Sequence, residues 1–472
     1  MAQASFNHKA VNLWTSRIIP LILMGIVGYV TYVVIVLICV DYLLKPPTSL
    51  QAPRHGAAAA ILVLYSILLL LIALTYFRLL YTVTYNPGYV PRGPQWHAQR
   101  ERKTREKRQN GRDYRKAQSP VSSEGIEGDA ITSSGDAFAP TTTEPAPGLR
   151  DFYSKDAFVC QGDGRPIWCS TCLNWKPDRT HHCREIERCV RKMDHFCPWV
   201  GGVVSETSFK FFTQFVAWTA IYCIFNLIVA AYFLAEYRRK THTLNVQWLV
   251  VLCLGALFGL FTAGMTGSSL QFAIVNTTTI ENLSRKTIVW TLALYMPKLP
   301  EATPGFRTIS YSAGTTSEGS NTHTDHPSRG VRTFAILYTK PGENPFDLGP
   351  YKNFKSVFGD HWYDWLLPIR YSPCCNHDRQ EGEFAMGPVV QRMRREAGIE
   401  FPAEVDEKSH RRRRHRRRRR RRRSSHSTGV KGIRTNQGED MREKDASGIG
   451  NDRDEVELEE GLRRTNGTAY HS

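Results

Sequence analysis

The stretch IIPLILMGIVGYVTYVVIVLICV, residues 18–40, contains no charged residue. A helix of about 20 residues crosses a hydrocarbon core about 30 Å thick. Because a charge at the centre of a membrane helix costs about 2.5–3.5 kcal/mol, its absence favours a membrane span over a buried helix of a soluble core. Three further uncharged stretches are long enough to span, namely residues 57–77, 211–235 and 246–275. The sequence therefore predicts an all-α multi-pass membrane protein with four transmembrane helices.

The positive charge of the chain is concentrated in its C-terminal tail. Of the net charge of +18, twelve positives come from the arginines at 411–414 and 416–423, so the remainder carries 18 − 12 = +6. The surrounding Ser-, Asp- and Glu-rich tail cannot bury enough apolar surface to fold. Such an arm typically contacts anionic lipid or RNA nonspecifically, so no specific nucleic-acid partner is expected.

The loops predict the orientation of the protein in the membrane. Most Lys and Arg lie in 84–210 and after Glu281, on the same side as the N-terminus if there are four spans. The positive-inside rule makes that side cytosolic, although Arg238–Lys240 fall in the opposite short loop. In the reducing cytosol, free thiols or metal ligands are expected rather than disulfides. Nothing in the sequence identifies the organelle.

Composition divides the chain into a series of segments. Residues 91–148 are rich in Arg, Gln, Ser, Thr, Gly and Pro and predict a flexible linker, while 305–330 and the chain after 404 are predicted to be disordered. The aromatic stretch 344–369 is expected to be ordered against the membrane face. The predicted domains are a cytosolic N-terminus (1–17), transmembrane helices 1 and 2 (18–83), a cytosolic linker (84–149), a cysteine-rich module (150–210), transmembrane helices 3 and 4 (211–275), a cytosolic C-terminal region (276–404) and an Arg-rich tail (405–472).

Four residues of the module have the spacing of a structural zinc site. Cys169 and Cys172 form a CxxC, His182 follows ten residues later, and Cys189 seven residues after that. A Cys3His set closes a tetrahedral zinc site with no open position. The alternative is a redox pair, but no βαβ pattern surrounds it. A structural zinc contributes on the order of 10 kcal/mol, which orders a module with few large apolar residues of its own.

The stretch CVRKMDHFCPWVGG, residues 189–202, sets a thiol beside an imidazole and a carboxylate. A cysteine is nucleophilic only as thiolate, and its ordinary pKa is about 8.5. His195 can take the proton of Cys197 or stabilise its thiolate, and Asp194 can orient the imidazole ring. The alternative is that Cys197 and His195 are zinc ligands. The residues alone leave both readings open.

Several motifs together resemble the DHHC family of protein S-acyltransferases. The segment 194–199, Asp-His-Phe-Cys-Pro-Trp, follows the upstream CxxC and His-Cys and lies between the second and third apolar stretches. The flanking motifs are also similar: Asn86-Pro87-Gly88 resembles the family's Asp-Pro-Gly, Thr278-Thr279-Ile280-Glu281 matches its TTxE, and the stretch around Asn353 resembles its C-terminal Asn-aromatic motif. The long linker and tail suggest a fungal member.

The resemblance implies transfer of a long-chain acyl group, usually palmitoyl, from acyl-CoA to cysteines of proteins at the cytosolic face. Cys197 would carry the acyl group, His195 would be the general base, and Asp194 would orient it. Trp199 is expected to lie near the carbonyl end of acyl-CoA. The acyl tail is expected in a cavity among the helices, because each buried CH2 contributes about 0.8 kcal/mol. The expected partners are palmitoyl-CoA, protein substrates and the lipid bilayer. Basic residues of the module either meet the CoA phosphates or are solvated surface: Lys176, Arg179, Arg184, Arg188, Arg191 and Lys192.

The sequence departs from the family at the second of its two zinc sites. The first set falls on Cys169, Cys172, His182 and Cys189, all present. The second falls on Cys183, Ile186, Phe196 and Val203, so three of its four ligands are replaced by apolar residues. One structural zinc is therefore expected, with an apolar cluster in place of the second. The family's Asn-Asn is Gly201-Gly202 here and its later Asn is Ser208, which predicts a looser turn after the nucleophile.

Two other functional classes remain as alternatives. A catalytically silent, zinc-stabilised membrane adaptor would share the module but take up no acyl group. A channel or transporter would be expected to carry charges or broken helices within its spans. Separately, Cys374 and Cys375 are either acylated themselves or ordinary packed thiols. Protein substrates, acyl-chain preference and oligomeric state do not follow from the sequence.

Overall fold

The computed structural model describes residues 8–47, 52–117, 148–297, 305–311 and 331–399. Four helices in these ranges are long and apolar enough to cross a membrane, as predicted, and they extend beyond the uncharged stretches at most ends: Trp14–Leu44, His55–Tyr85, Phe209–Thr241 and Val246–Val275. The predicted Arg-rich tail, 405–472, lies outside the described residues.

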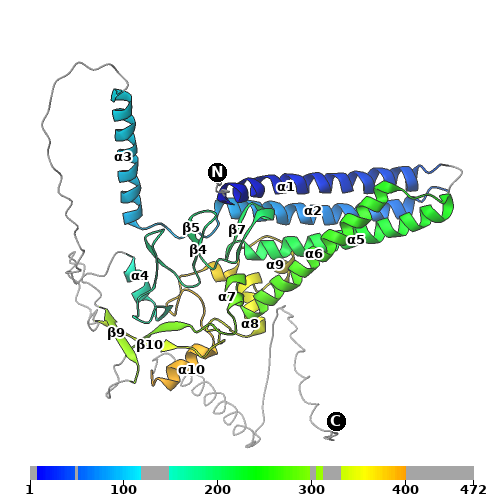
Figure 1. The fold of residues 1–472 in the computed structure, drawn as a ribbon. Coiled ribbons are helices and arrows are strands. Elements are labelled where there is room, and N and C mark those ends of the chain that lie inside the picture. The colour runs from blue at the N-terminus through cyan, green and yellow to red at the C-terminus, as the bar shows by residue number, and fades with distance from the viewer. Residues whose placement is uncertain (1–7, 48–51, 118–147, 298–304, 312–330, 400–472) are drawn as a thin grey trace, which may run out of the picture. The chain divides into compact units, whose positions relative to one another are not determined.

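The four spans form one bundle. The first span is α1 (His8–Tyr32), which continues as a π-helix, η1 (Val33–Leu44), and it is followed by α2 (His55–Tyr85), α5 (Phe209–Thr241) and α6 (Val246–Val275). Figure 1 shows α1, α2, α5 and α6 lying side by side. Large apolar side chains such as Leu260 (81% exposed) and Phe77 (70% exposed) point outward. Such a surface is expected of helices that face lipid.

The cysteine-rich module between α2 and α5 consists of three short antiparallel hairpins. They pair β2 (Ile167–Cys169) with β3 (Asn174–Lys176), β4 (His181–Cys183) with β5 (Arg188–Val190), and β6 (His195–Cys197) with β7 (Gly202–Val204). A 3-10 turn, η2 (Pro198–Val200), joins β6 to β7. The prediction of an all-α protein is therefore wrong for this part of the chain. Three-residue strands are too short to produce a readable alternation of apolar and polar residues.

A four-stranded antiparallel sheet adds further β-structure. Its strand order is β1 (Ala157–Val159), β8 (Thr291–Met296), β10 (Arg332–Tyr338) and β9 (Arg307–Tyr311). Strand β9 lies within 305–330, so the prediction of disorder is wrong for its five residues, and 312–330 lie outside the described residues. The prediction failed because β9 is polar and exposed, and it is ordered by pairing with the buried strand β10.

A helix interrupts the predicted flexible linker. Residues Pro94–Ala117 form α3, and a short helix, α4 (Leu149–Ser154), precedes β1. The Arg and Gln residues that suggested a linker are also strong helix formers, as are the Lys and Glu residues between them, and proline is favoured in the first turn. The remaining linker residues, 118–147, lie outside the described residues.

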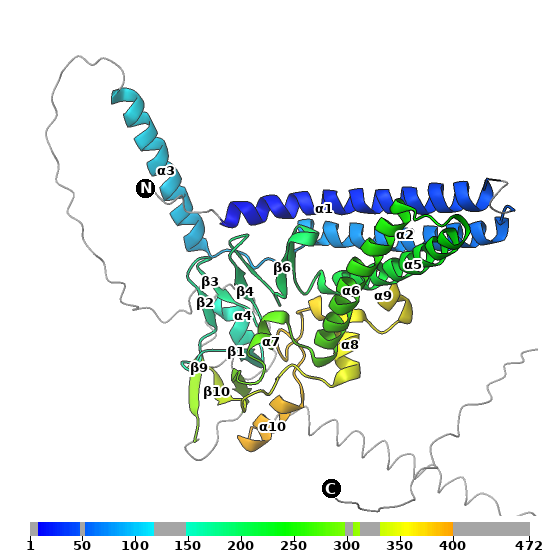
Figure 2. The same cartoon turned by 45° about the vertical axis from the view of Figure 1, so that its right-hand side comes forward.

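The C-terminal region packs against the ends of the spans, as the aromatic stretch predicted. It contains α7 (Thr279–Leu283), α8 (Pro350–Phe358), α9 (Trp362–Leu366), a 3-10 turn η3 (Pro373–Cys375) and α10 (Pro388–Glu396), and Figure 2 shows α8 near α6. The Asn353 amide donates to the carbonyl of Ile274 on α6 at 2.8 Å. The Gln214 amide on α5 donates to the carbonyls of Asp364 and Trp365 at 2.9 and 3.1 Å.

Candidate active site

The first two hairpins bring the four predicted zinc ligands together. The ligand atoms of Cys169, Cys172, His182 and Cys189 all lie within 4.8 Å of one another. The Nδ1 atom of His182 is 3.6, 3.4 and 3.8 Å from the Sγ atoms of these cysteines, in chain order. Tetrahedral zinc with ordinary bond lengths requires N···S separations of about 3.6 Å. The donor set and its geometry therefore fit a zinc ion.

The residues at the family's second zinc position form an apolar cluster, as predicted. Cys183, Ile186, Phe196 and Val203 pack together with Val190, Met193 and Ile280. The Cys183 thiol is buried and donates to the Glu185 carboxylate at 3.1 Å. Among the described residues, the Cys169 set is the one group of three or more Cys, His, Asp or Glu side chains close enough to share a metal.

Strand β6 explains why Phe196 stands between His195 and Cys197. Side chains alternate between the two faces of a strand, so residues 195 and 197 share one face while Phe196 points to the other. Phe196 lies in the apolar cluster, whereas Cys197 packs with Leu79 and Val83 of α2. Phe196 therefore points into the core of the module, and His195 and Cys197 point toward the membrane helices.

The turn after β6 requires glycine rather than merely tolerating it. Gly201 has φ +73°, a left-handed conformation that costs glycine little. A Cβ atom on Gly202 would lie 2.5 Å from the Cγ1 atom of Val83 on α2. The two glycines that replace the family's Asn-Asn therefore fit a close approach between β7 and α2.

Asp194 and His195 are hydrogen-bonded to each other, and His195 shares one face of β6 with Cys197. The Nδ1 atom of His195 is 2.7 Å from Oδ2 of Asp194, and its side chain also interacts with the Cys197 thiol. Burial lowers the pKa of His195, but its hydrogen bonds to Asp194 and Cys197 outweigh burial and raise the pKa from 6.5 to about 9. The site therefore favours an imidazolium beside the thiol, which is the arrangement that stabilises a thiolate.

Asp194 is held by Thr279, a residue for which no specific role was predicted from the sequence. The backbone N–H of Thr279 donates to Oδ1 of Asp194 at 2.9 Å, and the Thr279 hydroxyl donates to Oδ2 at 2.8 Å. Thr279 begins α7, directly after the fourth span. The TTxE motif had located this threonine in the sequence, but its separation of 85 residues from Asp194 concealed the contact.

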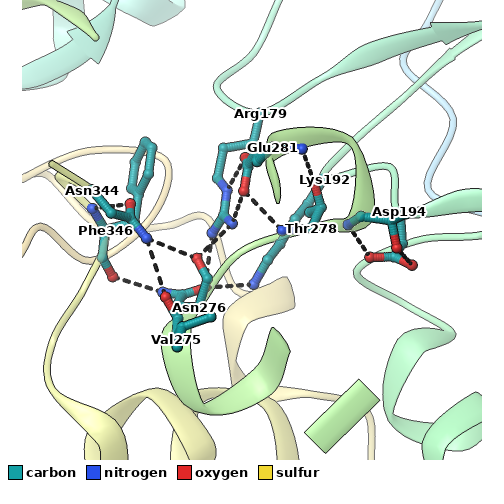
Figure 3. A network of polar contacts seen from close by, with 10 residues as sticks. Arg179, Lys192, Asp194, Val275, Asn276, Thr278, Glu281, Asn344 and Phe346 are labelled. Carbon is teal, nitrogen blue, oxygen red and sulfur yellow. Dashed lines mark hydrogen bonds and ion pairs between the residues drawn. The ribbon is translucent and has the colours of Figure 1, made fainter. Parts of the chain in front are cut away.

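A buried polar network fixes α7 in turn (Figure 3). The Arg179 guanidinium forms two hydrogen bonds to the Glu281 carboxylate, at 2.7 and 2.6 Å. It also donates to the side chain and the carbonyl of Asn276, both at 2.9 Å. Glu281 closes a capping box with Thr278 at the start of α7. The network thereby links the zinc-binding hairpins to the end of α6.

Two of the basic residues proposed for the CoA phosphates are not available to them. Arg179 is occupied by Glu281 and Asn276, and the buried Lys192 donates to Oδ1 of Asn276 at 3.1 Å. Their burial could not be foreseen from the sequence, because their partners are 84 to 102 residues away in the chain. Both residues are part of the scaffold.

Replacing Arg179 by methionine is expected to destabilise the protein by about 3–5 kcal/mol, because it leaves the Glu281 carboxylate buried and unpaired. Thermal unfolding of the purified protein in detergent measures this loss. The matched control is Arg184→Met, an exposed residue of the same module that forms no ion pair with any described residue. Equal melting temperatures for the two variants would contradict a stabilising role of the Arg179–Glu281 pair.

An apolar cavity of about 410 Å³ lies among the four spans, beside the Cys197 site. Tyr76 and Phe215 line the cavity and also pack in the cluster around Cys197. The Tyr76 hydroxyl donates to the carbonyl of Trp199 at 3.2 Å. Trp199 is 39% exposed, and its ring lies 6.0 Å from that of Phe261 on α6. The thiol and the cavity thus share a wall at the ends of the spans.

The structure shows what surrounds Cys374 and Cys375. Cys374 packs beside a core cluster that contains Phe346 and Phe384. The Cys375 thiol donates to the carbonyl of Glu206 at 3.3 Å. Both thiols thus make contacts within the protein, and acylation of either one stays a prediction.

Comparison with known proteins accounts for these features. The family model described as DHHC palmitoyltransferase matches residues 163–286. The chain is 48% identical to palmitoyltransferase pfa5 of Aspergillus fumigatus, over 84% of this chain and 93% of that protein. It is 45% identical to palmitoyltransferase pfa5 of Emericella nidulans, over 83% and 87%, and 31% identical to palmitoyltransferase PFA3 of Candida albicans, over 44% and 48%. With its hairpins, thiol site and four spans, the chain belongs to the DHHC palmitoyltransferase family.

Proposed function

We propose that Cys197 is the nucleophile through which this protein S-palmitoyltransferase moves an acyl group from acyl-CoA to protein cysteines. The observation that carries the proposal is that Asp194 is hydrogen-bonded to His195, which shares a strand face with Cys197 next to an apolar cavity. Such a chain of carboxylate, imidazole and thiol is typical of covalent catalysis.

In the first step the Cys197 sulfur attacks the carbonyl carbon of the thioester. A bond forms between that carbon and the Cys197 sulfur, and the bond to the CoA sulfur breaks. His195 takes the thiol proton and returns it to the leaving CoA thiolate. In the second step His195 removes the proton from a substrate cysteine, and the substrate sulfur attacks the acyl carbonyl carbon. The bond between that carbon and the Cys197 sulfur breaks, and His195 gives the proton to the departing Cys197 thiolate. Thr279 and Asp194 keep Nδ1 of His195 hydrogen-bonded throughout.

The acyl chain occupies the cavity among the spans. Its lining on α5 runs from Phe215 to Asn226, a rise of about 16 Å at 1.5 Å per residue. Burial in this apolar space contributes about 0.8 kcal/mol per CH2 group. Trp199, at the same end as Cys197, contacts the carbonyl end of acyl-CoA. This placement leaves the CoA group outside the membrane helices.

Tyr222 is expected to limit the length of the acyl chain. It lines the far part of the cavity on α5, and its hydroxyl is 2.8 Å from that of Tyr65, which is 2.7 Å from the Thr31 hydroxyl. Tyr222→Ala would deepen the cavity and shift the preference toward chains two carbons longer by about 100-fold or more, since each of the two added CH2 groups changes the rate about 10-fold or more in an apolar pocket. Competition between palmitoyl-CoA and stearoyl-CoA measures the ratio.

The matched control for Tyr222 is Tyr232→Ala. Tyr232 is on the same helix but faces outward, with 57% of its surface exposed. An unchanged ratio in Tyr222→Ala, or an equal change in both variants, would contradict this role.

The module binds one zinc ion through Cys169, Cys172, His182 and Cys189. The zinc ion would stabilise the fold of the module and take no part in the reaction, because four protein ligands leave no coordination position for substrate. The apolar cluster around Phe196 substitutes for the second site. Complete burial of an apolar side chain contributes roughly 1.5–3 kcal/mol, so the buried Val203 and the half-buried Ile186 and Phe196 offset part of the loss of a metal.

The module, both termini and the C-terminal region lie in the cytosol, which follows from the charge of the loops. The domains follow the order predicted from composition, from the N-terminal segment 1–17 to the tail at 405–472. The substrates are palmitoyl-CoA and proteins at the cytosolic face of a membrane.

The proposal is tested by mixing detergent-purified protein with palmitoyl-CoA and following CoA release. We expect a burst of about one CoA per chain and then slow turnover, the signature of an accumulating acyl-enzyme. His195→Ala is expected to slow the burst about 10²–10⁴-fold, because general base catalysis is lost. A zinc-replete, folded wild type with no burst would instead support the silent adaptor.

A further inference from the structure

A polar cavity of about 270 Å³ lies between the cysteine-rich module, the end of α6, helix α8 and the chain that follows η3. It shares no lining residue with the apolar cavity among the spans. A cavity of this size is slightly smaller than those that hold drug-sized molecules, so it suits a small ligand or one end of a larger one. Its charged lining residues are Lys192, Lys352, Lys355, Asp360, Arg379 and Glu383.

The two carboxylates of this lining already have partners. Oδ1 of Asp360 is 3.2 Å from Nζ of Lys355. Oε1 of Glu383 is 2.9 Å from a guanidinium nitrogen of Arg191, which does not line the cavity. Neither carboxylate is therefore left to neutralise the remaining cations.

Two of those cations are exposed. Lys352 is on α8, and Arg379 follows η3. Neither side chain makes a hydrogen bond or an ion pair with any residue that the structure describes. A single unpaired lysine is ordinary on a protein surface, but these two cations line one cavity from two different segments.

The third cation is buried. Lys192 is 9% exposed, and its ammonium donates one hydrogen bond, to Oδ1 of Asn276 at 3.1 Å (Figure 3). It forms no ion pair with a carboxylate within the described ranges of the chain. Burial lowers the pKa of Lys192, because a buried ammonium is costly unless an anion neutralises it. The cavity therefore contains a buried cation that lacks a carboxylate partner.

The Cys374 thiol is a further lining group that can become negative. Its hydrogen bond with Cys375 and the nearby Lys192 cation lower the pKa of Cys374, although burial opposes them. With Cys374 as a thiolate, four cations still face three anions in the lining, and Glu383 is shared with Arg191 outside it. The cavity thus keeps an excess of positive charge.

We propose that this cavity binds a phosphate group of a small ligand through Lys192, Lys352 and Arg379. A phosphate group carries up to two negative charges and three strong acceptor oxygens. An arginine binds such oxygens with two parallel hydrogen bonds, and a lysine binds them as a mobile point charge. The bound phosphate would join a buried cation of the module to two cations of the C-terminal region.

Two kinds of ligand at a cytosolic membrane face carry such a group. One is the nucleotide end of acyl-CoA, a source that rests on the proposed function, and the other is the phosphorylated headgroup of a membrane lipid. Adenosine bisphosphate serves as the probe for the first, and inositol trisphosphate serves as the probe for the second. Inorganic phosphate is the probe for the phosphate group alone.

Alkylation of Cys374 reports binding at the cavity itself. Cys374 lines the cavity, and its lowered pKa favours the thiolate that reacts with N-ethylmaleimide. Full-length protein in detergent is treated with this reagent at increasing concentrations of each probe, and peptide mass spectrometry measures the label on Cys374. The Arg-rich tail also attracts anions, but a label measured at Cys374 does not report binding there.

We expect at least one probe to slow the alkylation of Cys374 severalfold. In the Lys352→Gln, Arg379→Gln double variant, the half-protecting concentration should rise about tenfold or more, because charge-assisted hydrogen bonds are lost. Lys340→Gln is the matched control, since Lys340 is an exposed lysine of the same region outside the cavity. Zinc content and melting temperature verify that all three proteins are folded.

Equal protection in the wild type and the double variant, or no protection by any probe at millimolar concentration, would overturn the phosphate site. If acyl-CoA is the ligand, adenosine bisphosphate should protect best, and the double variant should raise the KM for palmitoyl-CoA about tenfold at an unchanged burst rate under saturation. If a lipid headgroup is the ligand, inositol trisphosphate should protect best and this KM should not change. A folded wild type in which a probe protects Cys374, but which releases no CoA, would overturn the proposed nucleophile and support the phosphate site.

Discussion

Replacing Cys172 by alanine is expected to unfold the cysteine-rich hairpins and to abolish acylation. Each hairpin has strands of only three residues, and the cluster around the site has few apolar side chains besides the ligands and Val90. A structural zinc contributes about 10–16 kcal/mol in small modules, which is comparable to the total stability of a domain. Zinc content, circular dichroism and limited proteolysis of the module measure the loss.

Cys183→Ala is the matched control for Cys172→Ala. Cys183 is equally buried, and it lies in the adjacent apolar cluster rather than among the four ligands. This variant is expected to retain one zinc per chain and most of the activity. A Cys172→Ala protein with an ordered module and normal acylation would contradict a folding role of the metal.

Asp194→Asn is expected to reduce the rate of acyl-enzyme formation by about 10²–10⁴-fold. An amide is nearly the same size, but it cannot stabilise the imidazolium of His195 or accept as strongly from Nδ1. It also presents an N–H₂ group where Thr279 donates two hydrogen bonds. Rapid-quench measurement of acylation with palmitoyl-CoA gives the rate, and the pKa of about 9 for His195 should fall toward its ordinary value.

Thr279→Val provides the comparison for Asp194→Asn. It removes the hydroxyl that donates to Oδ2 of Asp194 but retains the carboxylate and the backbone donor. A loss of roughly one order of magnitude is expected, since one hydrogen bond to a charged group contributes about 1.5–3 kcal/mol. An Asp194→Asn rate within threefold of wild type would contradict the orienting role of Asp194.

The membrane helices and the residues of the candidate site could be proposed from the sequence because both depend on local signals. Each span is an uncharged run, and the zinc ligands and Asp194-His195-Phe196-Cys197 follow one another within 30 residues. The apolar cluster around Phe196 was also predictable, because three metal ligands had been replaced by apolar residues together. The ends of the spans were less predictable, since aromatic and polar residues continue the helices into the interface.

The sequence did not reveal contacts between distant segments. Arg179 is basic and lies in a loop, which is typical of a surface residue, yet its partner Glu281 is 102 residues away. The contact of Thr279 with Asp194 likewise forms only when the loop after α6 is brought against β6. The short strands escaped prediction because metal ligands and turns, rather than alternating apolar residues, define them.

The most direct test of the account is the intact mass of the wild type, Cys197→Ala and Cys183→Ala after incubation with palmitoyl-CoA. We expect one hydroxylamine-sensitive palmitoyl adduct on the wild type and on Cys183→Ala, and none on folded, zinc-replete Cys197→Ala. An adduct that persists in Cys197→Ala at the wild-type level would contradict the assignment of Cys197 as the nucleophile.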